Sequence, residues 1–373
     1  MKKKKKKLFH SLAEKYRDST ALCKHFGKCG GCMFQDISYE NQLLLKKEYL
    51  NGLLGDTAAV DSVVPAEPFH YRSRMDMVTA FGKTGLREAN SYRHVVDIEE
   101  CPLMQAGMEE RYVRARALLA DIEDYDYLKH QGYLRYIVLR QARFTGEIML
   151  NLVTSTTEDR ISPVAEELAS LADSVSVLLS PGLADLSFGE VISDIKKGYI
   201  EEDFDGIRYR ISPNSFFQSN SLIAKEMYRR IKTFVKGRVT DLYCGIGSIS
   251  LFVADSAESV TGVELSAEST AAAEANRKLN AIENVNFICM DAKEHTAKCD
   301  TLILDPPRSG IHPSMLKRIY DMSPERIIYM SCNPASFKEN ADALEGYKIQ
   351  SFEAFDMFPQ TPHIETLAFL VKK

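Results

Sequence analysis

The chain has 373 residues, of which 45% are hydrophobic and 27% charged, and its formal net charge is −5. This composition is that of an ordinary water-soluble protein, and the length predicts two or three domains. The acidic balance argues against a uniformly basic nucleic-acid-binding protein, and no apolar run of about eighteen residues predicts a membrane span. No signal-peptide core follows the basic start, so we expect a cytoplasmic protein that acts as a monomer.

The N-terminus is strongly basic, because lysine occupies every position from Lys2 to Lys7. Residues 1–22 are predicted to form a disordered tail around this run. The run is either solvated without a further role or an electrostatic arm for RNA phosphates.

Four cysteines in the first part of the chain have the character of metal ligands. They are Cys23, Cys29, Cys32 and Cys101. In a cytosolic chain such a group favours a metal site over disulfides, and four thiolates suit either zinc or a [4Fe–4S] cluster. Residues 23–63, together with Cys101, are therefore interpreted as a metal-binding segment that includes an amphipathic helix over 36–54.

Residues 64–208 have the pattern of an α+β domain. Short apolar runs predict strands at 74–81, 135–143, 147–154 and 175–179. Two helical stretches, at 105–121 and 162–170, interrupt these strands.

From residue 209 to residue 373 strands and helices alternate. Strands are predicted at 238–243, 260–264, 285–289, 301–305 and 326–331, and two further strands, at 347–355 and 366–371, close the chain. Such alternation predicts an α/β fold with a doubly wound, Rossmann-like sheet, whose ligand lies at the carboxyl ends of the parallel strands.

A glycine turn follows the first of these strands, in the pattern Asp241-x-x-x-Gly245-x-Gly247. Glycine lets the backbone turn tightly and approach a ligand closely. Glu264, at the end of the next strand, is placed to accept both hydroxyls of a ribose. A dinucleotide site would need a third glycine where the chain has Ser250, so S-adenosylmethionine (SAM) is favoured over NAD.

Asp291 ends the third strand of the series and has two interpretations. Its carboxylate could accept a hydrogen bond from the amino group of an adenine. It could equally cap the turn or helix that follows, since aspartate is a preferred capping residue.

Cys332 and Glu365 are the candidate catalytic pair. Cys332 follows a predicted strand and is succeeded by Asn333-Pro334, which enforces a turn, and Glu365 precedes the last strand. The C5 atom of a pyrimidine becomes nucleophilic only after a thiolate adds at C6, and a base must later remove the C5 proton. One cysteine and one carboxylate meet that requirement.

The motifs together make the chain similar to the RNA (uracil-C5)-methyltransferases, which form 5-methyluridine. The resemblance runs from Cys23 to the C-terminus and rests on Cys23-x5-Cys29-Gly30-Gly31-Cys32, His70-Tyr71-Arg72-Ser73-Arg74, Phe216-Phe217-Gln218, Asp241-Leu242-Tyr243-Cys244-Gly245, Asp305-Pro306-Pro307-Arg308-Ser309-Gly310, Ser331-Cys332-Asn333-Pro334 and the stretch from Asp356 to Thr366.

The resemblance implies a SAM-dependent methyltransferase domain preceded by a central RNA-binding domain. It implies that Cys332 is the nucleophile and Glu365 the base. It assigns cofactor contacts to Gln218, Tyr243, Glu264 and Asp305. It also favours a [4Fe–4S] cluster over zinc at the four N-terminal cysteines.

The RNA target is the least specific expectation. Only 22 residues precede Cys23, too few for the small β-barrel that many relatives carry, and this favours 23S ribosomal RNA as the substrate. The alternatives are methylation of the transfer RNA T loop or, from another class, a non-catalytic iron–sulfur RNA-binding protein.

Overall fold

The computed structural model describes the backbone of residues 2–373 and the side chains of residues 9–373. The helices are α1 (Lys2–Tyr16), α2 (Tyr39–Leu54), α3 (Ala106–Leu118), α4 (Ser162–Leu168), α5 (Ser221–Phe234), α6 (Ser248–Phe252), α7 (Ala267–Leu279), α8 (Pro313–Met322) and α9 (Pro334–Ala343). Short 3₁₀ helices lie at Gly55–Thr57, Ala254–Ser256 and Ala292–Glu294. No helix among the described residues is long and apolar enough to cross a membrane.

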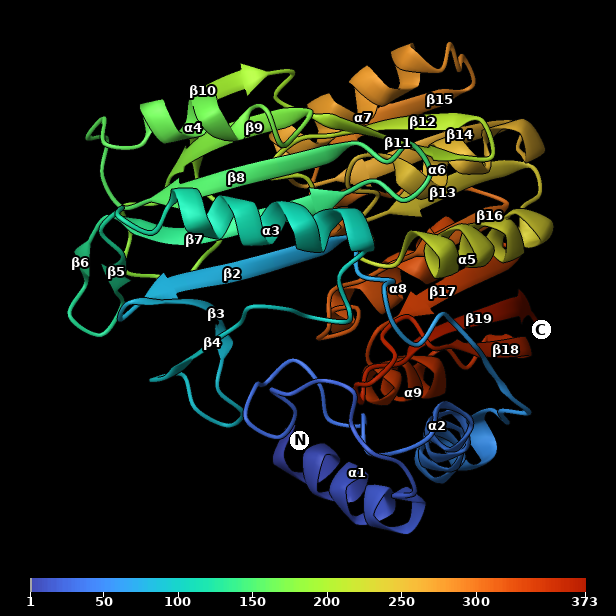
Figure 1. Cartoon of the computed structure of the whole chain (residues 1–373). Helices are drawn as coiled ribbons and strands as arrows, with labels where there is room; N and C mark the ends of the chain where they lie inside the picture. The colour runs from blue at the N-terminus through green and yellow to red at the C-terminus, as the bar shows by residue number, and fades with distance from the viewer. Residues whose placement is uncertain (1) are drawn as a thin grey trace.

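One sheet carries the C-terminal half of the chain (Figure 1). Its strand order is β1 (Val63–Val64), β18 (Tyr347–Phe355), β19 (Glu365–Lys372), β17 (Arg326–Ser331), β16 (Thr301–Leu304), β13 (Arg238–Leu242), β14 (Ser259–Glu264) and β15 (Val285–Cys289). All neighbours are parallel except β19, which runs antiparallel to β17 and β18. The predicted doubly wound α/β fold is confirmed, and its strand order reverses between β13 and β16.

A second sheet forms the central region (Figure 1). Its order is β10 (Glu190–Lys196), β9 (Ser174–Leu179), β8 (Ile148–Thr154), β7 (Leu134–Gln141), β2 (Arg74–Ala80), β3 (Lys83–Arg87) and β4 (Val95–Asp97). Only β8 and β9 are parallel, and α4 lies between them in the chain. Buried residues of α3 and α4 share one hydrophobic core with β7, β8 and β9, in agreement with the expected α+β arrangement.

Two hairpins complete the strands. One joins β5 (Tyr125–Asp126) to β6 (Gln131–Gly132), and the other joins β11 (Ile200–Phe204) to β12 (Ile207–Ile211). The second hairpin packs with α5 and α6 in the core of the C-terminal half. The expected domain boundary between residues 208 and 209 therefore falls inside β12.

The N-terminal segment is helical where a disordered tail is expected, and that prediction is wrong for Lys2–Tyr16. Phe9, Leu12 and Ala13 are buried, and the ring of Phe9 stacks on that of Tyr49 in α2 at 3.9 Å. The spacing of these residues puts an apolar stripe on one face of α1. Packing of this stripe against α2 stabilises the helix, although the run of lysines suggests a disordered tail. The electrostatic role considered for Lys2 to Lys7 concerns side chains outside those described.

Segments far apart in the sequence meet at the edge of the larger sheet. β1 pairs in parallel with β18, and α2 lies beside α9 at the base of the molecule (Figure 1). Residues of α1 and α2 share a hydrophobic core with β16, β17 and α8. The N-terminal segment is thus built onto the C-terminal half of the chain.

Candidate active site

The glycine turn after β13 meets the carboxylate at the end of β14. Gly245 adopts a φ of +55°, and its N–H donates to Oε2 of Glu264 at 3.1 Å. The other carboxylate oxygen, Oε1, accepts the N–H of Ser266 at 2.9 Å. At Gly247, with φ of +78°, a Cβ atom would lie 2.5 Å from Cζ of Phe287, so only glycine fits. These bonds orient Glu264 beside the turn, as the cofactor prediction requires.

Two further carboxylates lie near this turn, of which Asp305 is half-buried. Asp241 is completely buried, and its Oδ2 accepts the hydroxyl of Ser250 at 2.5 Å. Burial raises the pKa of Asp241 to about 7, with a contribution from the charge of Asp305, and burial raises the pKa of Asp305 to about 6. Ser250 thus fills the place of the missing third glycine with a hydrogen-bond donor. Asp241 lies in the recognised motif, yet its sequence alone does not single it out as a buried acid.

Asp291 acts as a cap in the structure. Its Oδ1 accepts the N–H of Lys293 at 3.0 Å, at the start of the short helix Ala292–Glu294, and its Oδ2 pairs with Nζ of Lys293 at 3.1 Å. The Lys293 N–H, followed by the side chain, lowers the pKa of Asp291. Asp291 also lies close enough to Tyr243 for its charge to raise the pKa of that phenol, after burial. Contact with an adenine stays a prediction.

Cys332 and Glu365 come together through strand pairing. In the antiparallel pair of β17 and β19, Ser331 lies opposite Thr366, and the hydroxyl of Thr366 donates to the carbonyl of Ser331 at 3.1 Å. The next position on each strand is therefore Cys332 on one side and Glu365 on the other. Cys332 is half-buried and Glu365 buried. Burial raises the pKa of the Cys332 thiol, and the charge of Glu365 raises it further.

Arg308 opposes this shift. Its guanidinium lowers the pKa of Cys332 through its charge and a side-chain hydrogen bond. The Arg308 carbonyl accepts hydrogen bonds from Nδ2 of Asn333 at 2.9 Å and from Oγ of Ser336 at 3.0 Å. These bonds tie the loop after β16 to the turn after β17. Arg308 is not among the residues predicted to be functional, although its place directly after Asp305-Pro306-Pro307 is a signal that it lies at the strand ends.

The segment containing Gln218 lies beside the same region. The side chain of Asn220 caps α5 by accepting the N–H of Ile223 at 3.4 Å, and its Nδ2 donates to the carbonyl of Met357 at 3.1 Å. The carbonyl of Gln218 accepts the hydroxyl of Ser73 at 3.4 Å. The structure therefore brings Gln218 near the stretch that leads to Glu365, between the central and C-terminal regions.

The four N-terminal cysteines line one cavity, which we call the cysteine cavity, and each carries a free thiol. The N–H of Gly31 donates to Sγ of Cys29 at 3.4 Å, and Nε2 of Gln35 donates to Sγ of Cys32 at 3.2 Å. Burial raises the pKa of Cys32 to about 12 and that of Cys101 to about 11.

Two buried nitrogen atoms at this cavity have no hydrogen-bond partner: Nε of Arg72 and Nε2 of His25. Both residues line the cavity together with the thiols. Within the described part of the chain, no three His, Cys, Asp or Glu side chains form a group that could hold a metal ion as they stand. The thiols thus surround a space and do not converge on one point.

The fold and the site define a class before any relative is considered. The sheet is doubly wound, and at its strand ends it carries a glycine turn with a carboxylate of the kind that binds ribose hydroxyls. A cysteine and a second carboxylate lie at the same strand ends. This arrangement is that expected of a SAM-dependent methyltransferase. The family model described as tRNA (Uracil-5-)-methyltransferase matches residues 38–298 and 295–373. The chain belongs to this family and is a SAM-dependent RNA (uracil-C5)-methyltransferase.

Individual relatives agree with this assignment. The tRNA (uracil(54)-C(5))-methyltransferase of Pyrococcus furiosus is 38% identical over 94% of this chain and 85% of that protein. An uncharacterized RNA methyltransferase of Thermotoga maritima is 35% identical over 94% of this chain and 84% of its own length. The crystal structure of the Pyrococcus abyssi tRNA (uracil-54, C5)-methyltransferase with S-adenosyl-L-homocysteine superposes with a TM-score of 0.81 at 32% identity, covering 91% of this chain and 86% of that one.

Proposed function

We propose that the protein transfers a methyl group from SAM to C5 of a uridine in the T loop of transfer RNA, at the position equivalent to uridine 54. The observation that carries the reaction is the pairing of Ser331 with Thr366, because it leaves Cys332 and Glu365 directly beyond that pair, close enough for the charge of Glu365 to raise the pKa of the thiol. The choice of transfer RNA is supported by the three Pyrococcus relatives, each a tRNA (uracil(54)-C(5))-methyltransferase. The preference for 23S ribosomal RNA that the sequence suggested receives no support from them.

In this proposal the first step belongs to Cys332. Its thiolate adds to C6 of the uracil, and the C5=C6 electron pair is released toward C5 as an enolate. Arg308 favours the thiolate form of Cys332. SAM, when bound, would supply an electrophilic methyl group to C5, and its methyl–sulfur bond would break with S-adenosylhomocysteine as the leaving group. Gln218, Tyr243, Gly245, Glu264, Asp291 and Asp305 are the residues proposed to hold the cofactor.

Glu365 completes the cycle. It removes the proton from C5, the C–H electron pair re-forms the C5=C6 double bond, and the bond between Cys332 and C6 breaks with sulfur leaving as a thiolate. The charge of Glu365 acts on the Cys332 thiol, and this closeness supports Glu365 as the base.

The target is tested with purified protein and tritiated SAM on three substrates: a transfer RNA transcript, the same transcript with uridine 54 changed to cytidine, and 23S ribosomal RNA. We expect label in the first transcript only. Label in 23S ribosomal RNA with none in transfer RNA would overturn the proposed target and leave the reaction standing.

We further propose that the cysteine cavity holds a [4Fe–4S] cluster on Cys23, Cys29, Cys32 and Cys101. Four thiols that surround a space suit a multinuclear cluster, and the unpartnered Nε–H of Arg72 is a donor of the kind that stabilises cluster sulfides, as is Nε2 of His25 in the tautomer that carries its proton there. When bound, such a cluster would join the N-terminal segment to the central region. Protein purified without air should then be brown and contain about four iron and four sulfide per chain. A colourless protein holding one zinc would refute the cluster and leave the methyltransferase function untouched.

A further inference from the structure

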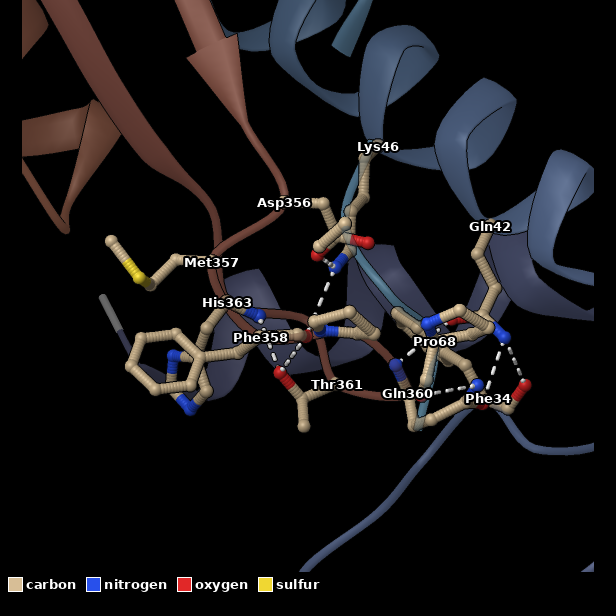
Figure 2. Close-up of polar contacts among 12 residues, drawn as sticks. Phe34, Gln42, Lys46, Pro68, Asp356, Met357, Phe358, Gln360, Thr361 and His363 are labelled. Atoms are coloured by element: carbon tan, nitrogen blue, oxygen red, sulfur yellow. Dashed lines mark hydrogen bonds and ion pairs between the residues drawn. The ribbon is translucent and has the colours of Figure 1, made fainter. Parts of the chain in front are cut away.

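We propose that helix α2 holds the catalytic base in position, with Lys46 and Gln42 as positioning residues for Glu365. The inference rests on the proposed role of Glu365 as base. It assigns to the N-terminal segment a part in the reaction, although none of its residues lies in the catalytic pair. The contact is with residues 356–364, the stretch between β18 and β19, which we call the base loop (Figure 2).

Lys46 forms the first connection. Its ammonium group pairs with Oδ1 of Asp356 at 2.5 Å and donates to the carbonyl of Phe358 at 3.2 Å. Both members of the ion pair are fully buried, and 310 residues separate them in the chain. Burial lowers the pKa of Lys46, whereas Asp356 opposes that shift and favours the charged ammonium. The ion pair holds the first residues of the base loop against α2.

Gln42 forms the second connection, one helical turn earlier on the same face of α2. Its Oε1 accepts the N–H of Gln360 at 2.9 Å, and its Nε2 donates to Oε1 of Gln360 at 2.8 Å. Gln360 has a φ of +67°, a left-handed conformation that is uncommon for a residue with a side chain. The hydrogen bonds of Gln42 support this conformation at the centre of the base loop.

The segment directly after Cys32 holds the other side of Gln360. The carbonyl of Gln360 accepts the N–H groups of Met33 at 2.8 Å and Phe34 at 3.1 Å. The phenol of Tyr71 adds a bond to the neighbouring carbonyl of Pro359 at 3.0 Å. The N–H and the carbonyl of Gln360 are thus both bound by the N-terminal segment, which also supplies Cys23, Cys29 and Cys32.

The base loop connects these contacts to Glu365, which follows its last residue directly in the chain. Its ends are joined by the sheet, since Phe355 pairs with Glu365. Within the loop, Thr361 donates to the carbonyl of Phe358 at 2.8 Å and accepts the N–H of His363 at 3.2 Å, and Figure 2 shows these bonds beside those from α2. Displacing Phe358 or Gln360 would therefore move the residues that set the start of β19.

If Lys46 and Asp356 served only to stabilise the fold, they would not need to be an ion pair. Replacement of a buried ion pair by apolar residues of similar size is often neutral or stabilising, so a buried pair is poor evidence for stability alone. What an apolar pair cannot do is donate to the carbonyl of Phe358 or fix the direction of the base loop. This difference makes the two roles separable by experiment.

The test compares Lys46→Met, the double variant Lys46→Met/Asp356→Leu and Gln42→Met with the control Lys47→Met, whose side chain is on the same helix but only half-buried. Two reactions are measured with the whole protein: the adduct formed with ordinary uridine transfer RNA and SAM, and the adduct trapped with 5-fluorouridine transfer RNA. The first accumulates when proton removal is slow. The second reports Cys332 addition and methyl transfer, since fluorine cannot leave as a proton.

We expect Lys46→Met and the double variant to accumulate adduct with ordinary uridine at least about tenfold over wild type, because a small misplacement of a catalytic group costs up to about a hundredfold. Trapping by 5-fluorouridine should stay near wild type, and Gln42→Met should show a smaller accumulation. The double variant should recover the melting temperature that Lys46→Met loses, without recovering turnover. The control Lys47→Met should behave as wild type in both reactions.

Two results would overturn the inference and leave the covalent mechanism standing. In the first, the double variant regains both stability and turnover, which shows that the pair acts through stability alone. In the second, every variant loses ordinary turnover and 5-fluorouridine trapping in parallel. A wild-type protein that forms no 5-fluorouridine adduct would refute the proposed covalent mechanism, and the inference with it, so that failure is distinguishable.

Discussion

The protein places cysteine in two contrasting environments. In the cysteine cavity four thiols face one another, and burial followed by the mutual repulsion of their thiolates raises the pKa of Cys32 to about 12. At the end of β17, Cys332 stands apart from them, half-buried between the cation of Arg308 and the carboxylate of Glu365. Burial raises the thiol pKa in both environments, so burial does not distinguish a ligand from a nucleophile.

The charged groups that surround each thiol distinguish the two environments. In the cavity the ionised form of one thiol is repelled by the others, so several thiolates are stable together only around a shared cation. At Cys332 the positive charge of Arg308 favours the thiolate that the proposed reaction needs, against burial and the charge of Glu365, which raise the pKa of the thiol. The contrast predicts that substitutions at the two sites fail in different measurements.

The largest effect is expected for Cys332→Ala. Methyl transfer should fall at least about a thousandfold, because the nucleophile is lost, whereas SAM affinity should change by less than about twofold. Radiolabel transfer and isothermal titration measure the two quantities. Cys299→Ala is the matched control, since Cys299 is a buried thiol at the opposite end of the strands. A 5-fluorouridine adduct that survives in Cys332→Ala would contradict the assignment.

Glu365→Gln comes next. The amide cannot accept a proton, so turnover should fall by about a hundredfold to ten-thousandfold, while addition and methyl transfer continue. Denaturing gels should show a methylated protein–RNA complex with ordinary uridine substrate. Normal turnover in Glu365→Gln would place the base on another group.

Cys101→Ser tests the other environment. Iron content should drop to a small fraction of the wild-type value and the melting temperature should fall by several degrees, since metal binding and folding are coupled. Methyl transfer, measured on the fraction that remains folded, should fall by no more than about tenfold, a smaller loss than at Cys332. Cys332→Ala should retain its full iron content. If both variants lost iron equally, the contrast between the two cysteine environments would not hold.

Arg308→Met should have the smallest effect and the clearest pH dependence. Below the raised pKa of Cys332 the thiolate fraction increases about tenfold per pH unit, so the rate of 5-fluorouridine trapping should rise with pH. Loss of the Arg308 charge raises this pKa further, which should slow trapping at neutral pH by about three- to tenfold. The difference should vanish at high pH, where both proteins carry the thiolate. Lys317→Met, which removes an exposed positive charge from α8, is the control, and a deficit that persisted at high pH would point to RNA contact instead.

The regular parts of the fold follow from local patterns. Strands β15, β17 and β18 begin and end at the predicted residues, because each is an apolar run with clear breaks on both sides. Strand β10 was missed because it is an edge strand whose side chains are almost all exposed, so it has no alternation to detect. Helix α1 was missed because its lysines hide the short apolar stripe that packs on α2.

The residues of the site also divide into those that the sequence singles out and those that only the packed structure reveals. Cys332, Glu365 and Glu264 stand at strand ends within recognisable motifs, and their roles in the reaction and in cofactor binding stay predictions. Asp241 could not be identified as a buried acid, since its environment arises from the packing of neighbouring strands. The partnership of Lys46 with Asp356 carries no local signal at all, because the two residues are 310 positions apart.

That separation has a consequence for biosynthesis. A ribosome adding about 5 to 20 residues per second needs roughly 15 to 60 seconds to travel from Lys46 to Asp356. During this interval the ammonium group of α2 lacks the carboxylate that it later pairs with, so the N-terminal helices cannot reach their final packing. Part of the apolar face of the N-terminal helices therefore stays uncovered until the last strands emerge, because these helices share their hydrophobic core with the C-terminal half of the chain.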